Sequence, residues 1–343
     1  MDLLGKAPIV SGASRGVGRA ASIQTNPQLK DGDSPTQEDH LMPRNLGFVG
    51  VGIMGQRMCR NLLKAGFPVW AYDVSPAAVQ AVAALGATPA PDLPALARQA
   101  DVVVTSLPDP AALLAVTDGP HGLLAHLKPG AYLCDTSTVD PGTSRKVYEA
   151  ARARGIRALD CPVSGGPGGA EAGTLTIMVG GEAADLEAVR PVLEAIGRKI
   201  VHCGGAGAGE VAKLVNQALV AVHTVAAVEA LLLGRKLGLD LGTMVSILRS
   251  SSGGSWILEN HLRIKALAGN YEPGFALDLM FKDLNLFLQT ATEAKAPALI
   301  AASALQLYNA ARAAGSGKLD QTVVAREMEK LAGIALGTLN PEQ

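Results

Sequence analysis

The chain has 343 residues, with 30 Lys and Arg against 31 Asp and Glu, so its formal net charge is −1. A balanced charge excludes the basic surface on which binding to duplex nucleic acid depends, and we expect no nucleic-acid partner. Hydrophobic residues make up 48% of the chain, which excludes wholesale disorder. The length is typical of about two domains.

The four cysteines lie far apart without a Cys-x-x-Cys pair, which favours a reduced, cytoplasmic protein over a disulfide framework. The histidines show no zinc-binding spacing, so we expect no metal. The first residues lack the apolar run of a signal peptide. The longest apolar stretch, 214–234, contains Asn216, Gln217, His223 and Glu229, which argue against a membrane span. We therefore expect no membrane partner.

Residues 1–43 are predicted to be a disordered or non-native extension. Residues 24–45 are polar and rich in Pro, Asp and Gln, as linkers are. The stretch from Ser11 to Gly18 resembles the cofactor loop of short-chain dehydrogenases, but no strand with a ribose-binding acid follows it. Met42 would be a natural alternative start.

Residues 44–206 are predicted to form the first domain, which is of the α/β class. Short apolar runs alternate there with segments of helical spacing. The runs cover 46–50, 68–73, 101–107, 131–137, 156–163 and 174–181. Continuous apolar strands separated by helices indicate a parallel-rich sheet covered on both faces.

Residues 207–343 are predicted to form an all-α C-terminal domain, since no further strand pattern follows. Its first helix is expected from about Gly209 to Leu237 and would span roughly 40 Å. Gly205–Gly209 is interpreted as a flexible joint leading into it. A helix this long and apolar is buried on most sides, so we expect it to join the two domains or to pack against another subunit.

A glycine-rich loop follows the first predicted strand and opens a helix. It consists of Gly50, Val51, Gly52, Ile53, Met54 and Gly55. In a dinucleotide-binding loop, Gly50 would make the tight turn, Gly52 would admit the pyrophosphate, and Gly55 would allow close packing of helix and strand. The helix N-terminus would offer free N–H groups to the phosphates.

Asp73 ends the second predicted strand, eighteen residues after Gly55. A carboxylate at this place accepts the ribose hydroxyls and repels a 2′-phosphate. Val74 and Ser75 follow, and neither offers an arginine to hold such a phosphate. The sequence therefore predicts that residues 44–206 are a Rossmann-type domain that binds NAD, and it favours NAD over NADP.

Two further segments are candidates for chemistry. Lys213, Asn216 and Gln217 share one face of the long helix by their spacing. A lysine in an apolar cleft loses hydration, which lowers its pKa towards the range of proton transfer; a solvated lysine is the alternative. The loop 164–169 follows a predicted strand and offers a hydroxyl and bare N–H groups to an anion, or is a plain turn.

From about Leu46 to Glu327 the chain resembles the β-hydroxyacid dehydrogenase family. The segments that carry the resemblance are GFVGVGIMGQRMCRNLLKAG, DCPVSGGPGGAEAGTLTIMVGG, GAGEVAKLVNQ and LMFKDLNL. The resemblance implies that Lys213 is the general acid and base. It implies that Ser164, Gly165 and Gly166 hold the substrate carboxylate, and that Asn216 or Gln217 orients the hydroxyl. It also places Leu107, Pro108 and Thr138 at the cofactor, and Lys282 near the nicotinamide and substrate. A homodimer or homotetramer is expected, as in the family.

The substrate is left open by two conflicting signals. Gln217 matches tartronate semialdehyde reductases, whereas 3-hydroxyisobutyrate dehydrogenases have Asn there. Residues 249–260 instead look like the 3-hydroxyisobutyrate branch. We expect hydride transfer between NAD and a small 3-hydroxy acid resembling 3-hydroxyisobutyrate, with tartronate semialdehyde reduction as the alternative. Imine reductases are a rival, but they tend to replace the lysine with Asp or Tyr. A non-catalytic cofactor-binding module would need a disabled site.

Overall fold

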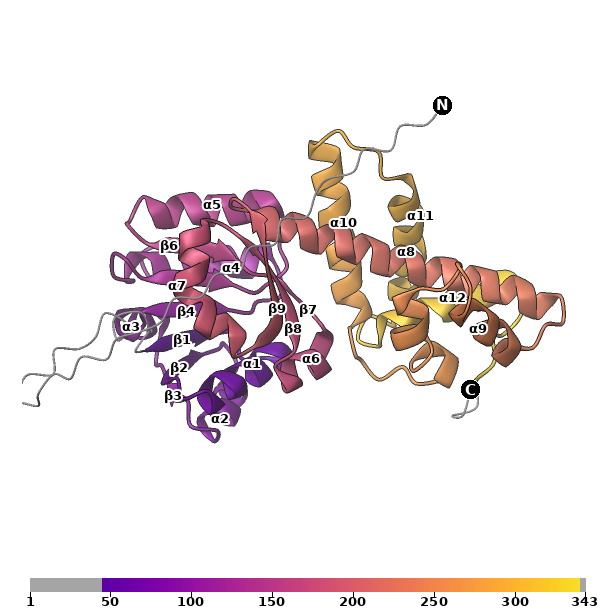
Figure 1. Ribbon diagram of the computed structural model, residues 1–343, viewed down its shortest axis with the longest axis horizontal. Helices are drawn as coiled ribbons and strands as arrows, with labels where there is room; N and C mark the ends of the chain where they lie inside the picture. The colour runs from indigo at the N-terminus through magenta and orange to yellow at the C-terminus, as the bar shows by residue number, and fades with distance from the viewer. Residues whose placement is uncertain (1–44, 340–343) are drawn as a thin grey trace, which may run out of the picture. The chain divides into compact units, whose positions relative to one another are not determined.

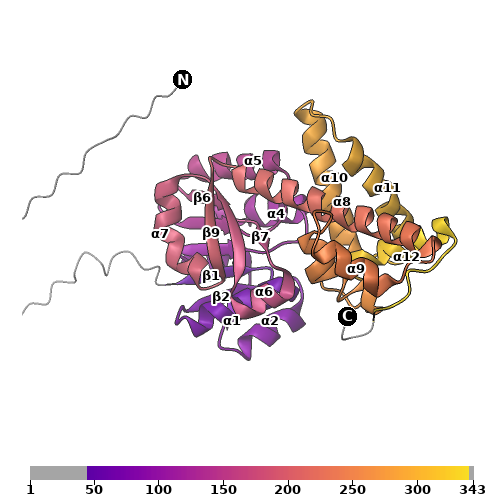
Figure 2. The ribbon, with the colours of Figure 1, turned by 45° about the vertical axis from the view of Figure 1, so that its right-hand side comes forward.

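The computed structural model describes residues 45–339, and Figures 1 and 2 show their elements from two directions. The predicted extension 1–43, with its Ser11–Gly18 motif, lies outside the described residues. The strands are β1 (Leu46–Val49), β2 (Val69–Tyr72), β3 (Thr88–Pro89), β4 (Val102–Thr105), β5 (Tyr132–Asp135), β6 (Arg157–Asp160), β7 (Val163–Ser164), β8 (Leu175–Gly180) and β9 (Gly197–Gly204).

The helices between the strands are α1 (Ile53–Lys64), α2 (Pro76–Ala83), α3 (Leu93–Gln99), α4 (Pro110–Thr117), η2 (Leu123–Ala125), α5 (Pro141–Arg152), α6 (Gly166–Ala172) and α7 (Ala183–Glu194). Several begin at a Ser or Asp that accepts a hydrogen bond from the amide three residues on. Asp109 before Pro110 and Asp140 before Pro141 are examples. The cap satisfies a free amide, and proline fits the first turn, so these helix starts are encoded locally.

The strands form a nine-stranded sheet in the order β3-β2-β1-β4-β5-β6-β8-β7, with β9 beside β8. The pairs from β3 to β6 are parallel, whereas β8 runs antiparallel to β6 and β7. Residues of α1, α2, α6 and α7 build the core on one face, and those of α3, α4 and α5 build the core on the other. The predicted parallel-rich α/β fold is confirmed.

Two sequence predictions about strands were wrong in detail. The run 156–163 is split into β6 and β7, because Pro162 between them has no amide to continue the ladder. β9 was missed because Arg198, Lys199 and His202 interrupt its apolar pattern. It pairs only with β8, so these exposed side chains face solvent at the edge of the sheet.

The chain from residue 207 to residue 339 contains helices and no strand, as predicted. The helices are α8 (Ala208–Lys236), α9 (Leu241–Arg249), η3 (Leu258–Leu262), η4 (Ala266–Ala268), α10 (Leu277–Glu293), α11 (Leu299–Ala313), η5 (Gln321–Val323) and α12 (Val324–Ala332). Helix α8 starts beside β8 and β9 and continues along α10, α11 and α12 (Figure 1). The described residues belong to one compact unit, so the division at 206 and 207 into two domains stays a prediction.

Among the described residues, α8 is the one helix long and apolar enough to cross a membrane by length and composition. Its Glu210, Lys213 and Gln217 are buried inside the protein. Further along, Ala218 and Ala221 pack in one helical core, while Val228 and Leu231 pack in a second. These residues pack inside the protein, but only 39% of the most apolar window of α8 is buried, so the prediction that this helix is buried on most sides was wrong for the single chain.

Candidate active site

The glycine-rich loop lies where the strand order reverses, because β1 has β2 on one side and β4 on the other. Ligands of open α/β sheets bind at this point, beyond the carboxyl ends of the strands. Gly50 has φ +90°, and a Cβ there would collide with the carbonyl oxygen of Ser106. A Cβ on Gly55 would collide with the carbonyl of Gly50, so α1 packs directly on the turn.

The same loop leaves room for a bound group above Gly52. An added Cβ at Gly52 would meet nothing within 4 Å, unlike those at Gly50 and Gly55. Ile53 opens α1 with a 66% exposed side chain, and Met54 packs against the sheet core. The open space lies at the N-terminus of α1, where free N–H groups favour an anion. The loop therefore fits the pyrophosphate of a dinucleotide.

Asp73 follows β2 and braces the loop. Its Oδ2 accepts the amide of Val51 at 2.8 Å, and its Oδ1 accepts the amide of Ser75 at 2.8 Å. Each carboxylate oxygen has a second lone pair that these bonds leave free. The acid is therefore fixed beside the glycine loop, as a ribose-binding acid must be.

The predicted cofactor residues Leu107 and Pro108, which follow β4, are held in place by Asp135, a buried acid at the end of β5 that the sequence analysis missed. The Asp135 Oδ1 accepts hydrogen bonds from the hydroxyls of Thr105 and Ser137, each at 2.6 Å. Ser137 Oγ in turn accepts the amide of Leu107 at 2.8 Å. Pro108 follows Leu107 directly, so Asp135 fixes the strand-end loop that carries both predicted residues.

The predicted substrate loop begins in β7 with Ser164 and continues into α6. Gly165 and Gly166 have φ values of +135° and +61°, which favour glycine. Helix α6 is held against α1, where Asn61 Nδ2 donates to the Ala170 carbonyl at 2.7 Å. Glu171 of α6 also pairs with Arg57 and Arg60 of α1. The substrate loop is thus anchored to the helix that opens at the glycine loop.

Lys213 is 6% exposed and lies on the face of α8 that meets this loop. Its Nζ donates to the Val163 carbonyl at 2.8 Å and to Gln217 Oε1 at 3.2 Å. Asn216 Nδ2 donates to the same Gln217 oxygen at 3.0 Å, so the three predicted side chains do come together. Burial lowers the pKa of Lys213, the direction expected from the sequence, while the charges of Asp283 and Glu210 oppose the shift.

Asp283 of α10 joins the remaining predicted residues to this group. Its Oδ2 accepts Gln217 Nε2 at 2.6 Å, and its Oδ1 pairs with Lys282 Nζ at 2.9 Å. Lys282 Nζ also donates to the Thr138 carbonyl at 2.5 Å. The sequence reading missed Asp283, although it follows Lys282 directly within the quoted LMFKDLNL segment. A continuous set of hydrogen bonds and ion pairs therefore links the Val163 carbonyl to the Thr138 carbonyl. It passes through the side chains of Lys213, Gln217, Asp283 and Lys282.

Two more buried acids at the start of α8 were missed. Asp160 ends β6 and caps α8, because its carboxylate accepts the amides of Gly207 at 2.7 Å and Glu210 at 3.0 Å. Glu210 is completely buried, and among the described residues the polar group that approaches its carboxyl is the Val139 amide, without the geometry of a good hydrogen bond. Burial raises the pKa of Glu210 well above its ordinary value, and nearby Asp135 and Asp160 add to the shift. The Glu210 carboxyl therefore keeps its proton to a higher pH than an exposed glutamate does.

Within residues 45–339, no three His, Cys, Asp or Glu side chains gather as a group that could hold a metal ion. Trp256, within the 249–260 segment, is 68% exposed and does not belong to the core.

Comparisons with known proteins cover both parts of the chain. The family model described as the NAD binding domain of 6-phosphogluconate dehydrogenase matches residues 45–205. The model described as NAD-binding of NADP-dependent 3-hydroxyisobutyrate dehydrogenase matches residues 207–328.

Named relatives are similar over nearly their whole length. A 2-(hydroxymethyl)glutarate dehydrogenase of Eubacterium barkeri is 40% identical over 291 residues, which is 85% of this chain and 97% of that protein. An NAD-dependent L-serine dehydrogenase of Pseudomonas aeruginosa is 39% identical over 84% of this chain and 99% of that protein.

Among solved structures, Mycobacterium tuberculosis 3-hydroxyisobutyrate dehydrogenase with L-serine has a TM-score of 0.78 at 35% identity. The match covers 84% of this chain and 99% of that one. The glycine loop, the buried lysine and these full-length matches agree, and the chain belongs to the β-hydroxyacid dehydrogenase family of NAD-binding oxidoreductases.

Proposed function

We propose that the protein reversibly oxidises the primary alcohol of a small 3-hydroxy acid, with bound NAD supplying the hydride acceptor. The observation that carries this proposal is the position of Lys213. Its buried amine, whose pKa is lowered by burial, donates to the carbonyl of Val163. Val163 directly precedes Ser164, the first residue of the predicted carboxylate loop.

In the proposed reaction, Lys213 takes the proton of the substrate hydroxyl as the carbinol carbon loses its hydride. The C–H and O–H bonds break, a carbonyl forms, and the amine becomes an ammonium. The reverse reaction returns that proton to the carbonyl oxygen. A neutral amine is required for oxidation, and the desolvation of Lys213 favours this form.

Ser164 and the N–H groups of Gly165 and Gly166 would anchor the substrate carboxylate, and Gln217 or Asn216 would orient its hydroxyl. Anchoring the carboxylate fixes the distance from Lys213 to the reacting carbon, which turns positioning into rate. Lys282 would sit where its charge attracts the anionic substrate, next to the Thr138 carbonyl that it contacts. Asp73 and the loop 50–55 would hold NAD.

The substrate class follows from what the relatives are named for. L-Serine, 3-hydroxyisobutyrate and 2-(hydroxymethyl)glutarate are all 3-hydroxypropionates that differ in the group on carbon 2. We propose a substrate of this class and favour the methyl group of 3-hydroxyisobutyrate. Tartronate semialdehyde reduction is the alternative, because glycerate has the same skeleton with a hydroxyl on carbon 2, and Gln217 matches that branch.

The test is to measure NAD reduction with 3-hydroxyisobutyrate, glycerate, L-serine, 2-(hydroxymethyl)glutarate, threonate and 3-hydroxypropionate. Lys213→Ala should lower kcat by about a thousandfold and leave the Kd for NAD unchanged, since general acid–base groups contribute factors of this order. Lys146 on α5 provides the control substitution, which should leave both constants unchanged. Near-normal turnover of Lys213→Ala would contradict the assignment.

The rival functions give different outcomes in the same assay. An imine reductase would reduce cyclic imines with NADH or NADPH and leave the hydroxy acids untouched. A non-catalytic cofactor-binding module would bind NAD and turn over no substrate at all.

We also propose that the protein is a homodimer or homotetramer. Helix α8 exposes an apolar stripe at helical spacing, formed by Val211, Val215, Leu219 and Leu233. Their side chains are between 41% and 62% exposed, and such stripes usually mark a subunit contact. Light scattering at micromolar concentration should give at least twice the mass of the chain. A cytoplasmic location is proposed because the described cysteines are free thiols.

A further inference from the structure

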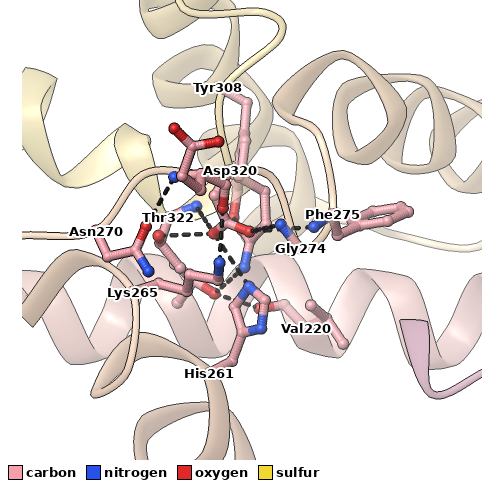
Figure 3. A network of polar contacts seen from close by, with 12 residues as sticks. Val220, His261, Lys265, Asn270, Gly274, Phe275, Tyr308, Asp320 and Thr322 are labelled. Carbon is pink, nitrogen blue, oxygen red and sulfur yellow. Dashed lines mark hydrogen bonds and ion pairs between the residues drawn. The ribbon is translucent and has the colours of Figure 1, made fainter. Parts of the chain in front are cut away.

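The loop 270–276, which leads into α10, is held by one buried carboxylate. Asp320 is completely buried, and Figure 3 shows it at the centre of a polar network. Its Oδ2 accepts the amides of Gly274 at 3.0 Å and Phe275 at 3.1 Å. Its Oδ1 accepts the amide and hydroxyl of Thr322 and the Nε2 of His261. The network therefore ties the loop to η3 and η5.

The other contacts of the loop lie in the same region. The Asp320 amide donates to the Tyr271 carbonyl at 3.0 Å, and the Gln321 amide donates to the Phe275 carbonyl at 2.8 Å. Lys265 Nζ donates to the Glu272 carbonyl at 2.6 Å. The backbone on both sides of Gly274 is thus fixed from the helical part of the chain.

The loop lies close to the proposed carboxylate loop at Gly166. A Cβ on Gly166 would lie 3.9 Å from the carbonyl oxygen of Gly274. Gly274 is packed closely against Asp320 and His261, because a Cβ added at Gly274 would lie 3.2 Å from Asp320 Oδ2 and 3.4 Å from the His261 ring. A shift of His261 or Asp320 would therefore displace Gly274, whose carbonyl lies near Gly166.

His261 is the member of this network that can be replaced with the least disturbance, because its side chain is partly exposed and makes one hydrogen bond to Asp320. Its side chain is 19% exposed, and its Nε2 lies 3.1 Å from Asp320 Oδ1. The hydrogen bond from His261 lowers the pKa of Asp320, so this carboxyl is ionised and Nε2 is the donor. Asp320 holds five donors, and its truncation would leave buried amides without an acceptor and destabilise the fold.

We infer that His261, acting through Asp320, is a positioning residue for substrate binding: it keeps Gly274 beside Gly166 and so fixes the position of the backbone next to the carboxylate loop. The inference rests on the proposed function of that loop. Neither His261 nor Asp320 touches Lys213, the glycine loop 50–55 or Asp73 in any contact of the described residues, so the effect is confined to the substrate side.

The kinetic test uses His261→Leu, which removes the donor, and His261→Gln, which keeps an amide donor at similar reach. The Leu variant should raise the KM for the hydroxy acid about tenfold, or about 1.4 kcal/mol, with kcat and the KM for NAD within about twofold. The Gln variant should restore most of the loss. Equal changes in both KM values, an unchanged KM for the hydroxy acid, or no rescue by Gln would overturn the inference.

A second measurement does not depend on turnover. Backbone hydrogen exchange in His261→Leu should become faster over 270–276 and over 164–168. His126→Leu is the matched control, because His126 also makes a single Nε2 bond, to Pro120, in a loop outside the proposed site. Unchanged exchange over 164–168 in His261→Leu would contradict the coupling. Should the wild-type protein oxidise no hydroxy acid, the proposed function fails, and the exchange data still decide whether His261 positions Gly166.

Discussion

The cofactor loop and the lysine cluster are built in opposite ways. Residues 50–55 are consecutive, and their shape follows from a left-handed Gly50 and from glycines that admit close packing. The cluster around Lys213 brings together groups that are 50 and 66 residues apart in the chain, Val163 with Lys213 and Gln217 with Asp283. A consecutive loop is encoded locally, whereas the cluster exists only when α8 and α10 pack on the α/β part.

Because the two regions are built separately, mutations in each region should have different effects. Changes in the glycine loop should act on NAD binding and leave the protonation of Lys213 alone. Changes around Lys213 should act on the proton transfer and on its pH dependence, with NAD binding intact.

Among the changes that act on NAD binding, the largest effect should come from Gly50→Ala. An alanine at φ +90° is strained by up to about 3 kcal/mol, and its Cβ would also collide with the Ser106 carbonyl. We expect the Kd for NAD, measured by calorimetry, to rise about a hundredfold, with a lower Tm.

Gly52→Ala is the matched variant, since its Cβ meets nothing within 4 Å. It should keep the Tm of the NAD-free protein and weaken only NAD binding, because the space above it is where we place the pyrophosphate. A Gly52→Ala protein that binds NAD normally would show that the cofactor lies elsewhere.

A smaller effect is expected from Asp283→Asn. The charge of Asp283 opposes the burial that lowers the pKa of Lys213, so its removal should lower that pKa further. The neutral amine would then persist to lower pH, and the acidic limb of the pH profile for oxidation should move to lower pH. We expect kcat/KM to fall about tenfold from the loss of positioning.

The Kd for NAD serves as the internal reference for this variant and should not change. A pH profile that stays in place, or moves to higher pH, would show that Asp283 does not act on Lys213.

The smallest effect should come from Glu210→Gln and should appear in stability. The folded protein keeps Glu210 protonated well above its ordinary pKa of 4.5, whereas the unfolded chain releases the proton. Wild-type stability should therefore fall as the pH rises above that value. Glutamine has no proton to release, so the Tm of the variant should rise relative to the wild type by about 1–2 °C for each kcal/mol of stability recovered.

Thermal unfolding at about pH 5 and about pH 8 measures this difference, because at both values the unfolded chain has released most of the Glu210 proton that the folded chain holds, so the rise in pH between them disfavours the folded wild type. Asp135 and Asp160 also have pKa values raised by burial and should keep part of the slope in the variant. A difference in Tm that is the same at both pH values would mean that Glu210 is ionised in the folded protein.

Much of the fold could be predicted from the sequence because its signals are local. Short apolar runs separated by segments of helical spacing predicted the parallel strands. The helix predicted from Gly209 to Leu237 is found as Ala208–Lys236. β9 could not be predicted, because a strand at the sheet edge tolerates Arg198, Lys199 and His202 on its exposed positions. The antiparallel pairing of β7 with β8 could not be predicted either, because it depends on which strand lies beside β7 after the chain breaks at Pro162.

The sequence by itself determined the glycine loop, the acid at Asp73 and one helix face with Lys213, Asn216 and Gln217. Each depends on backbone conformation or on helical periodicity, which act over a few residues. The tertiary structure alone decided that Asp283 joins Lys282 to Gln217, that Asp160 caps α8 and that Asp320 holds Gly274. These acids are buried against groups far away in the chain, and only packing brings in the donors that make their burial tolerable.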